Sequence, residues 1–238
     1  MKNYQNILYT LNPEGDSISF DNKQYYRYMD KLYIPNIPSA LELQDVIALS
    51  EIRIKLDKSI INYNYTKGTI RKLFSYFPKT DDFSLLDFGS GNGILSEVIK
   101  EDNLSYIKKL TGVDACEYAT VQSLVTYENN LNIEVQTSVF DNSKALNIKS
   151  NSIDGIISSF VMHFKMYDMQ LNELHRVLKP SGYFVYNDYV YDKYTSNARR
   201  LIKKLKDIGF ILIKEDTEFF LEPKSNTLKP QRIMVFTK

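Results

Sequence analysis

An acidic residue and three closely spaced glycines stand at the end of an apolar run. Asp87 is the second-last residue of the mostly apolar stretch 84–88. Gly89, Gly91 and Gly93 follow that stretch. Glycine allows a backbone to turn sharply and to lie against a ligand, because it carries no side chain. A strand that breaks into such a turn and then starts a helix is typical of a nucleotide-type site at the carboxyl end of a parallel strand. The segment therefore predicts a ligand site of that kind.

A second acid follows at the separation expected for a ribose contact. The stretch 109–115 reads as a short strand ending in Asp114 and Ala115, about 25 residues past the first glycine. The two oxygens of a carboxylate can accept hydrogen bonds from both hydroxyl groups of a ribose. The alternative role for Asp114 is that of a turn former at the end of a strand.

The spacing G-x-G-x-G differs from the dinucleotide fingerprint G-x-G-x-x-G. With Asp87 two residues before the first glycine, it resembles motif I of the class I S-adenosylmethionine-dependent methyltransferases. Asp114-Ala115 resembles their second motif. The segments 140–154 and 171–185 resemble the ubiquinone/menaquinone-type branch, the latter through a run similar to E-x-x-R-V-L-K-P-G-G. This resemblance covers residues 85 to 187. It implies an α/β fold with a Rossmann-like seven-stranded sheet of order 3-2-1-4-5-7-6, in which the last strand is antiparallel.

The same resemblance implies S-adenosyl-L-methionine as the cofactor. Asp87 is expected near its amino group and Asp114 on its ribose hydroxyl groups. The acceptor for the adenine amino group is either Asp141 or Asn142: counting back from Leu146 selects Asn142, whereas a charged acceptor favours Asp141. The residues expected to bind the cofactor are Asp87, Gly89, Ser90, Gly91, Asn92, Asp114, Ala115, Phe140, Asp141, Asn142 and Ser158.

The chain divides into two regions. Strands and helices alternate from residue 85 onward, so 81–238 is expected to be the methyltransferase domain. Residues 1–80 do not fit the alternation, and helical spacing at 41–61 and 69–77 indicates a helical cap. In related enzymes such helices form a lid over the acceptor. The acceptor site is expected to include Tyr25, Tyr26, Tyr33, Phe160 and Tyr189, and Lys67 is a candidate partner for the carboxylate of the cofactor.

Two residues are candidate bases, His163 and Asp188, because each follows a strand that ends near the expected methyl group. The fourth strand is followed by Ser158-Ser159-Phe160-Val161 and not by [DNS]-P-P-[YF]. That motif marks many enzymes that methylate base amines or glutamine. Its absence favours a small-molecule acceptor that is methylated on an oxygen, nitrogen or carbon atom.

Composition fits an enzyme without a metal or a membrane span. The 238 residues carry 30 Lys and Arg against 29 Asp and Glu, a formal net charge of +1, which weighs against a large nucleic-acid surface. No apolar stretch is long enough to span a membrane, and the N-terminus lacks the apolar core of a signal peptide. The single Cys116 cannot form an internal disulfide, and there is no Cys/His cluster. A cytoplasmic location is expected.

Other functions are compatible with part of this pattern. A nucleic-acid methyltransferase would use the basic stretch 199–206 to contact phosphates, although such a stretch is more often the solvated face of a helix. A cofactor-binding protein without catalysis could serve as a regulator or partner subunit. Aminopropyl-type transfer is a further use of the same cofactor, but the 171–185 run favours methyl transfer.

Overall fold

The structure is a computed structural model of the chain. It describes residues 17–20, 23–28, 32–35, 41–55, 63–190, 195–222 and 226–238, the first three stretches as backbone only.

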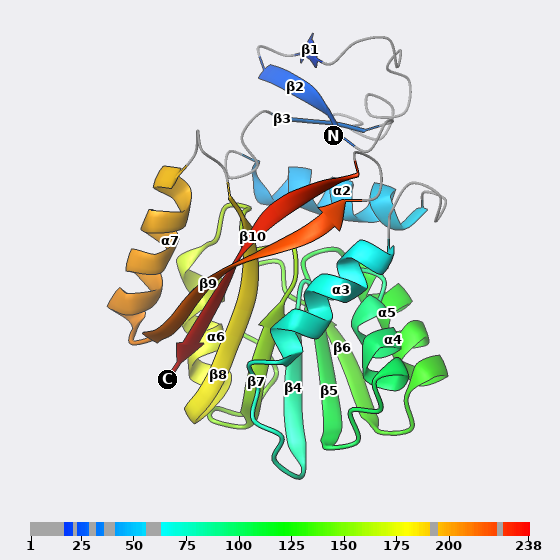
Figure 1. Ribbon diagram of the computed structural model, residues 1–238, viewed down its shortest axis with the longest axis vertical. Coiled ribbons are helices and arrows are strands. Elements are labelled where there is room, and N and C mark those ends of the chain that lie inside the picture. Colours follow the sequence, from blue (N-terminus) through cyan, green and yellow to red (C-terminus); the bar gives the residue numbers. More distant parts are fainter. Residues whose placement is uncertain are drawn as a thin grey trace.

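A seven-stranded sheet forms the centre of the molecule (Figure 1). Its strands are β4 (Phe83–Phe88), β5 (Ile107–Asp114), β6 (Glu134–Val139), β7 (Ile153–Ser158), β8 (Leu178–Tyr189), β9 (Ile211–Glu222) and β10 (Thr227–Thr237). They lie in the order β6-β5-β4-β7-β8-β10-β9. The first five pair in parallel, and β10 pairs antiparallel with both β8 and β9. Numbered from β4, this order is 3-2-1-4-5-7-6, so the expected sheet is confirmed.

Helices cover both faces of this sheet. They are α3 (Tyr63–Phe74), α4 (Ile94–Glu101) and α5 (Glu117–Asn130) on one face and α6 (Asp168–Val177) and α7 (Thr195–Ile208) on the other (Figure 1). Successive strand residues point to opposite faces. Leu86 and Ile156 therefore pack with α6 and α7, whereas Leu85 and Ile157 pack with α3, α4 and α5. Burial on both faces explains why β4 and β7 are nearly continuous apolar runs.

The N-terminal region only partly matches the expected helical cap. α2 (Leu43–Lys55) lies within the expected 41–61, whereas α3 overlaps the expected 69–77 but begins six residues before it. However, residues 17–35 contain a three-stranded antiparallel sheet of β1 (Ser17–Phe20), β2 (Lys23–Tyr28) and β3 (Leu32–Pro35), which lies beyond α2 in Figure 1. An all-helical cap is therefore wrong for this part. Tyrosine and isoleucine favour a pleated strand surface, which accounts for the strands.

Candidate active site

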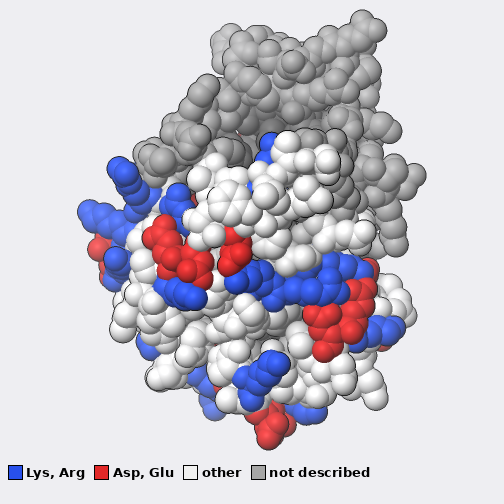
Figure 2. All heavy atoms as spheres, viewed as in Figure 1, with Lys and Arg blue, Asp and Glu red and all other residues white. Residues whose placement is uncertain are grey.

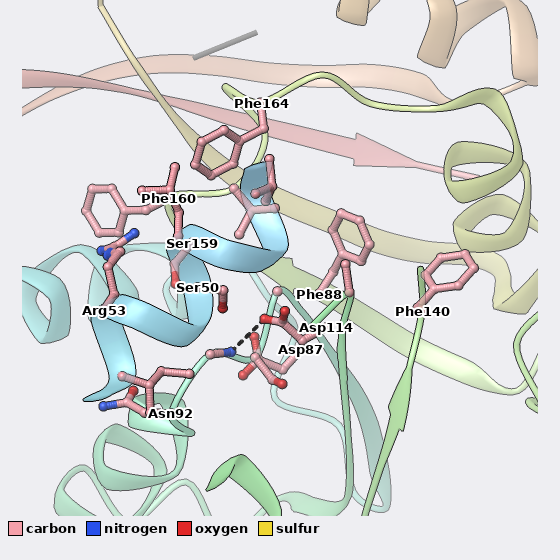
Figure 3. A pocket seen from close by; sticks show the side chains of 18 of the residues that line it. Ser50, Arg53, Asp87, Phe88, Asn92, Asp114, Phe140, Ser159, Phe160 and Phe164 are labelled. Carbon is pink, nitrogen blue, oxygen red and sulfur yellow. Dashed lines mark hydrogen bonds between the residues drawn. The ribbon is translucent and has the colours of Figure 1, made fainter. Parts of the chain in front are cut away.

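A cavity lies at the carboxyl ends of the central strands, between the sheet and α2 (Figure 3). Parallel strands place their ends at one edge, where an open α/β sheet binds its ligand. From the sheet domain it is lined by Asp87–Asn92, Ile94, Leu95, Asp114, Ala115, Phe140, Ser159, Phe160, Val161, Phe164, Lys165, Met166 and Gln170. From the N-terminal region it is lined by Leu43, Val46, Leu49, Ser50, Arg53, Ile54, Tyr63 and Thr66.

Glycine is needed in the loop for two different reasons. All three residues have positive φ, +83° at Gly89, +53° at Gly91 and +83° at Gly93, which glycine adopts without strain. A Cβ on Gly89 would lie 2.3 Å from Val161, and one on Gly93 would lie 2.9 Å from the Cβ of Thr126. A Cβ on Gly91 would meet no atom within 4 Å. Gly89 and Gly93 are therefore required for packing, whereas Gly91 leaves space open beside the cavity.

Asp114 connects the end of β5 to the glycine loop. Its Oδ2 atom accepts a hydrogen bond from the backbone N–H of Gly91 at 3.0 Å, and its Oδ1 atom accepts one from Cys116 at 2.9 Å (Figure 3). Burial raises the pKa of this carboxyl, and the backbone donors of Cys116, Gly91 and Ala115, together with the charge of Arg53, partly oppose the rise. Each carboxylate oxygen has a second lone pair, so the group can still accept from two ribose hydroxyl groups.

Asp87 is buried beneath the cavity. The hydroxyl of Tyr127 donates a hydrogen bond to its Oδ2 atom at 2.7 Å. The pKa of Asp87 is raised to about 7, mainly by burial. The Tyr127 hydrogen bond opposes this rise, and the nearby charge of Asp114 adds to it. A buried carboxyl that is half protonated near neutral pH gains from a cation placed beside it, which suits the amino group expected there.

The remaining residues expected to bind the cofactor fall into two groups. Ser90, Asn92, Ala115 and Phe140 line the cavity. Ser158 does not: its hydroxyl is buried and donates to the carbonyl oxygen of Phe88 at 2.9 Å, and the next residue, Ser159, lines the cavity instead. A strand alternates its faces, so a shift of one residue exchanges an inward side chain for an outward one.

Neither Asp141 nor Asn142 is among the residues that line the cavity. The Oδ1 atom of Asp141 accepts hydrogen bonds from the backbone and the hydroxyl of Ser143, at 3.0 and 2.5 Å, which hold its pKa below the usual range. Asn142 has a φ of +71°, and its Oδ1 atom is buried without a hydrogen-bond partner among the described residues. A buried acceptor without a partner is costly, so this atom is suited to a donor from a ligand.

The two candidate bases lie outside the lining of the cavity. The ring of His163 packs against Phe164 and Tyr189, with centroids 4.1 and 5.0 Å apart, and burial lowers its pKa to about 3, helped by the charge of Arg53. Asp188 is buried on β8 opposite Arg232, and burial raises its pKa to about 6, which Arg232 partly opposes. His163 is therefore neutral throughout the physiological range.

An aromatic group borders the cavity beyond β7. Phe160 has a φ of +58°, which is unusual for a bulky residue, and its N–H donates to the side chain of Asn187 at 2.9 Å. Its ring centroid lies 5.9 Å from that of Tyr65 and 5.7 Å from that of Tyr189. The Tyr65 hydroxyl accepts from Gln231, whose side-chain oxygen accepts from Asn187. This hydrogen-bonded chain fixes Phe160 at the rim. The side chains of Tyr25, Tyr26 and Tyr33 lie outside the described part of the structure.

Sequence reasoning missed the residues of α2 and the first turn of α3. Ser50, Arg53, Tyr63 and Thr66 line the cavity although none of them belongs to a motif. The Asn92 side chain, which the glycine motif does identify, donates to the Tyr63 hydroxyl at 2.8 Å. The apolar stripe in residues 41–61 predicted the helix. It was also the one sequence feature that could have indicated that α2 packs over the cavity.

Residues 86–186 match the family model described as a methyltransferase domain. The fold is that of the class I methyltransferases. The matched domain and the structural neighbours imply S-adenosylmethionine as the cofactor. The match is to the domain as a whole and does not single out the ubiquinone/menaquinone-type branch. No curated protein matches the sequence.

Several solved structures resemble the chain. An S-adenosylmethionine-dependent methyltransferase from Mesorhizobium loti has a TM-score of 0.52 at 14% identity, over 72% of this chain and 96% of that one. A methyltransferase from Aquifex aeolicus gives 0.50 at 18% identity, over 74% and 98%. The cyclase SpnF gives 0.57 at 16% identity, over 72% and 80%. At these identities the likeness concerns the fold, and SpnF illustrates that one fold carries more than one reaction.

Three further features concern membrane spans, metal ligands and the cysteine. None of the helices in the described ranges is long and apolar enough to cross a membrane. Within those same ranges, no group of three or more His, Cys, Asp or Glu side chains could hold a metal ion. Cys116 is buried with its thiol reduced, immediately before α5.

Proposed function

We propose that the protein transfers a methyl group from S-adenosylmethionine to a small-molecule acceptor by in-line displacement. The observation that carries this proposal is the cavity itself. It joins the glycine loop and Asp114 to an aromatic border, and α2 covers it from the other side. An acceptor must fit between α2 and the strand ends, which favours a small molecule over a polymer.

The order of the strands suggests how the cofactor lies. Phe140 follows β6, Asp114 ends β5, and the glycine loop and Ser159 follow β4 and β7. These strands are neighbours in the order β6-β5-β4-β7, so their ends form one line. We place the adenine beside Phe140, the ribose on Asp114, and the methionyl part over the glycine loop, with its amino group toward Asp87.

For the adenine amino group we now favour Asn142 over Asp141. Ser143 already provides two donors to Asp141, whereas the Oδ1 atom of Asn142 is buried and has no partner within the described chain. An amide oxygen accepts a hydrogen bond from an amine as a carboxylate does, without a charge.

Transfer in this site relies on positioning. The sulfonium of the cofactor supplies an electrophilic methyl group, and the protein has to align a nucleophile behind it. Holding two reactants in line contributes about 7–11 kcal/mol in favourable cases. Phe160 and Phe164 offer planar apolar surface at this end, and no histidine or glutamate is among the described lining residues. A base role for His163 or Asp188 would require the acceptor to reach past Phe160 and Tyr189, so we propose that transfer proceeds without them.

The surface charges support a small acceptor over a nucleic acid. Figure 2 shows basic side chains over α7 and across the middle of one face, with acidic ones beside them. Ion pairs join Lys67 to Glu97 and Glu101, and Lys204 to Asp168. A basic side chain that is already paired contributes less to phosphate binding than a free one. Lys204 is on α7, so its pair with Asp168 favours the interpretation of α7 as a solvated outer helix.

Calorimetry and labelling test the proposal in sequence. The protein is titrated with S-adenosylmethionine and with S-adenosylhomocysteine, and it is then incubated with methyl-labelled cofactor and a metabolite extract, with Asp114→Ala as the inactive control. We expect both ligands to bind and label to enter the small-molecule fraction only with the parent protein. Label in the nucleic-acid or protein fraction would contradict the small-molecule acceptor. Binding without any transfer would favour a regulatory protein.

A further inference from the structure

The cofactor carries one negative charge, the carboxylate at its methionyl end. None of the residues described above is placed on this carboxylate. The carboxylate there stands beside an ammonium and a sulfonium, both positive. Lys67, the candidate from the sequence, does not line the cavity, and its Nζ atom lies 2.7 Å from Glu97 and 2.5 Å from Glu101. A different cation has to be considered.

Two basic side chains line the cavity in the described ranges, Lys165 and Arg53. Lys165 is at the rim and 42% exposed, and its Nζ atom lies 2.8 Å from both carboxylate oxygens of Glu42. Arg53 comes from α2, and in Figure 3 its side chain lies over Asn92 and beside Phe160 and Ser159, whereas Phe140 lies across the cavity. Arg53 is thus at the end where the methionyl part is expected.

We infer that Arg53 binds the carboxylate of the cofactor. The inference rests on the proposed orientation of S-adenosylmethionine. Asp87 lies on the sheet side of the cavity and attracts the ammonium of the cofactor, while Arg53 enters from the α2 side (Figure 3). A guanidinium beside the ammonium or the sulfonium would be repelled, so the carboxylate is its favourable partner. Its two N–H edges match a carboxylate and form charge-assisted hydrogen bonds.

The position of α2 supports this role. Beside its first turn, the Tyr167 hydroxyl donates to Glu42 at 3.1 Å and accepts from the backbone N–H of Leu43 at 3.2 Å. Lys165 pairs with the same Glu42. These contacts attach the start of α2 to the segment after β7. Arg53 is two residues before the C-terminal end of α2. A bound cofactor would therefore hold the C-terminal end of α2 against the sheet, and α2 would form part of the cofactor site.

Decarboxylated S-adenosylmethionine tests this inference, because it lacks only the carboxylate. Calorimetry measures the affinity of the full-length parent and of Arg53→Gln for both ligands. We expect the parent to bind S-adenosylmethionine about 10- to 100-fold more tightly than the decarboxylated ligand. Arg53→Gln should bind the two almost equally, and Arg53→Lys should recover part of the preference, because it restores the charge without the planar fork.

Lys165→Gln is the matched control, because it removes the other cation of the same cavity. It should keep the parent's preference for the carboxylated ligand. If Arg53→Gln also keeps that preference, or weakens both ligands equally, Arg53 does not bind the carboxylate. If the parent binds neither ligand, the proposed function fails and not this inference alone. Thermal unfolding of each variant separates a local effect from a folding defect.

Discussion

The backbone N–H of Gly91 donates a hydrogen bond to the Oδ2 atom of Asp114 at 3.0 Å. Gly91 is in the loop that follows β4, Asp114 ends the neighbouring strand β5, and the two residues belong to separate sequence motifs. Because of this bond, the acid expected on the ribose also holds the loop expected under the methionyl part. The two halves of the cofactor site are therefore mechanically joined before any ligand binds.

Asp114→Ala should weaken cofactor binding by about 2–4 kcal/mol, since charge-assisted hydrogen bonds to the ribose are lost together with support for the loop. Asp114→Asn is the matched variant. It keeps one acceptor oxygen and places an N–H group where the second acceptor was, so we expect an intermediate loss. Calorimetry with S-adenosylhomocysteine measures both. An Asp114→Ala protein that binds as tightly as the parent would contradict the ribose assignment.

Alanine at Gly89 and at Gly91 should have opposite consequences. Each substitution places a side chain on left-handed backbone, at about 1–2 kcal/mol. Gly89→Ala adds a clash with Val161 at 2.3 Å, so its main effect should be a lower melting temperature. Gly91→Ala meets no atom of the protein, so its main effect should be weaker cofactor binding. Thermal unfolding and calorimetry on the pair decide this, and equal binding by Gly91→Ala and the parent would refute it.

Cofactor affinity should fall as the pH decreases from 7 to 5. The pKa of Asp87 is about 7 in the free protein, and only the ionised carboxylate attracts the ammonium of the cofactor. Below pH 7 ionisation has to accompany binding, which costs about tenfold in affinity for each pH unit. Calorimetry in two buffers of different ionisation enthalpy should detect the released proton. Asp87→Asn should flatten the profile, and a slope that survives this substitution would assign the effect to another group.

Asp87→Asn should also stabilise the free protein at pH 8. The pKa of Asp87 in the folded state lies above its unfolded value, so folding becomes less favourable as the pH rises from about 4 through about 7. The neutral amide avoids this cost and still accepts from the Tyr127 hydroxyl. We expect a gain on the order of 2–4 kcal/mol at pH 8 that decreases toward pH 5. Denaturant unfolding at both pH values measures it, and a variant less stable than the parent at pH 8 would show that Asp87 is not destabilising.

Asn142→Ala should weaken binding of the cofactor, and Asp141→Ala should change it less than twofold. The lost hydrogen bond to the adenine amino group is uncharged and contributes about 0.5–1.5 kcal/mol. Asp141 instead accepts from Ser143, and its loss should appear in local stability. Titration with S-adenosylhomocysteine gives both affinities. The reverse order would restore Asp141 as the adenine acceptor.

The centre of the cofactor site could be predicted from local spacing, whereas the order of the sheet followed from the resemblance of the motifs to those of the class I methyltransferases. An apolar run followed by Asp87 and three glycines can form little other than a buried strand and a tight turn. The acid that ends β5 is encoded in the same way. Parallel strands bring their carboxyl ends together, so motifs far apart in sequence could be placed at one edge of the sheet.

The tertiary structure decided what depends on contacts between distant segments. The placement of Arg53 and Tyr63 in the cavity follows from how α2 and α3 pack, and no spacing within either helix encodes it. The exchange of Ser158 for Ser159 follows from the face that each presents at the end of β7. The bond between Gly91 and Asp114 requires the pairing of β4 with β5. Local sequence determines turns and strands, whereas packing between elements determines which side chains face a ligand.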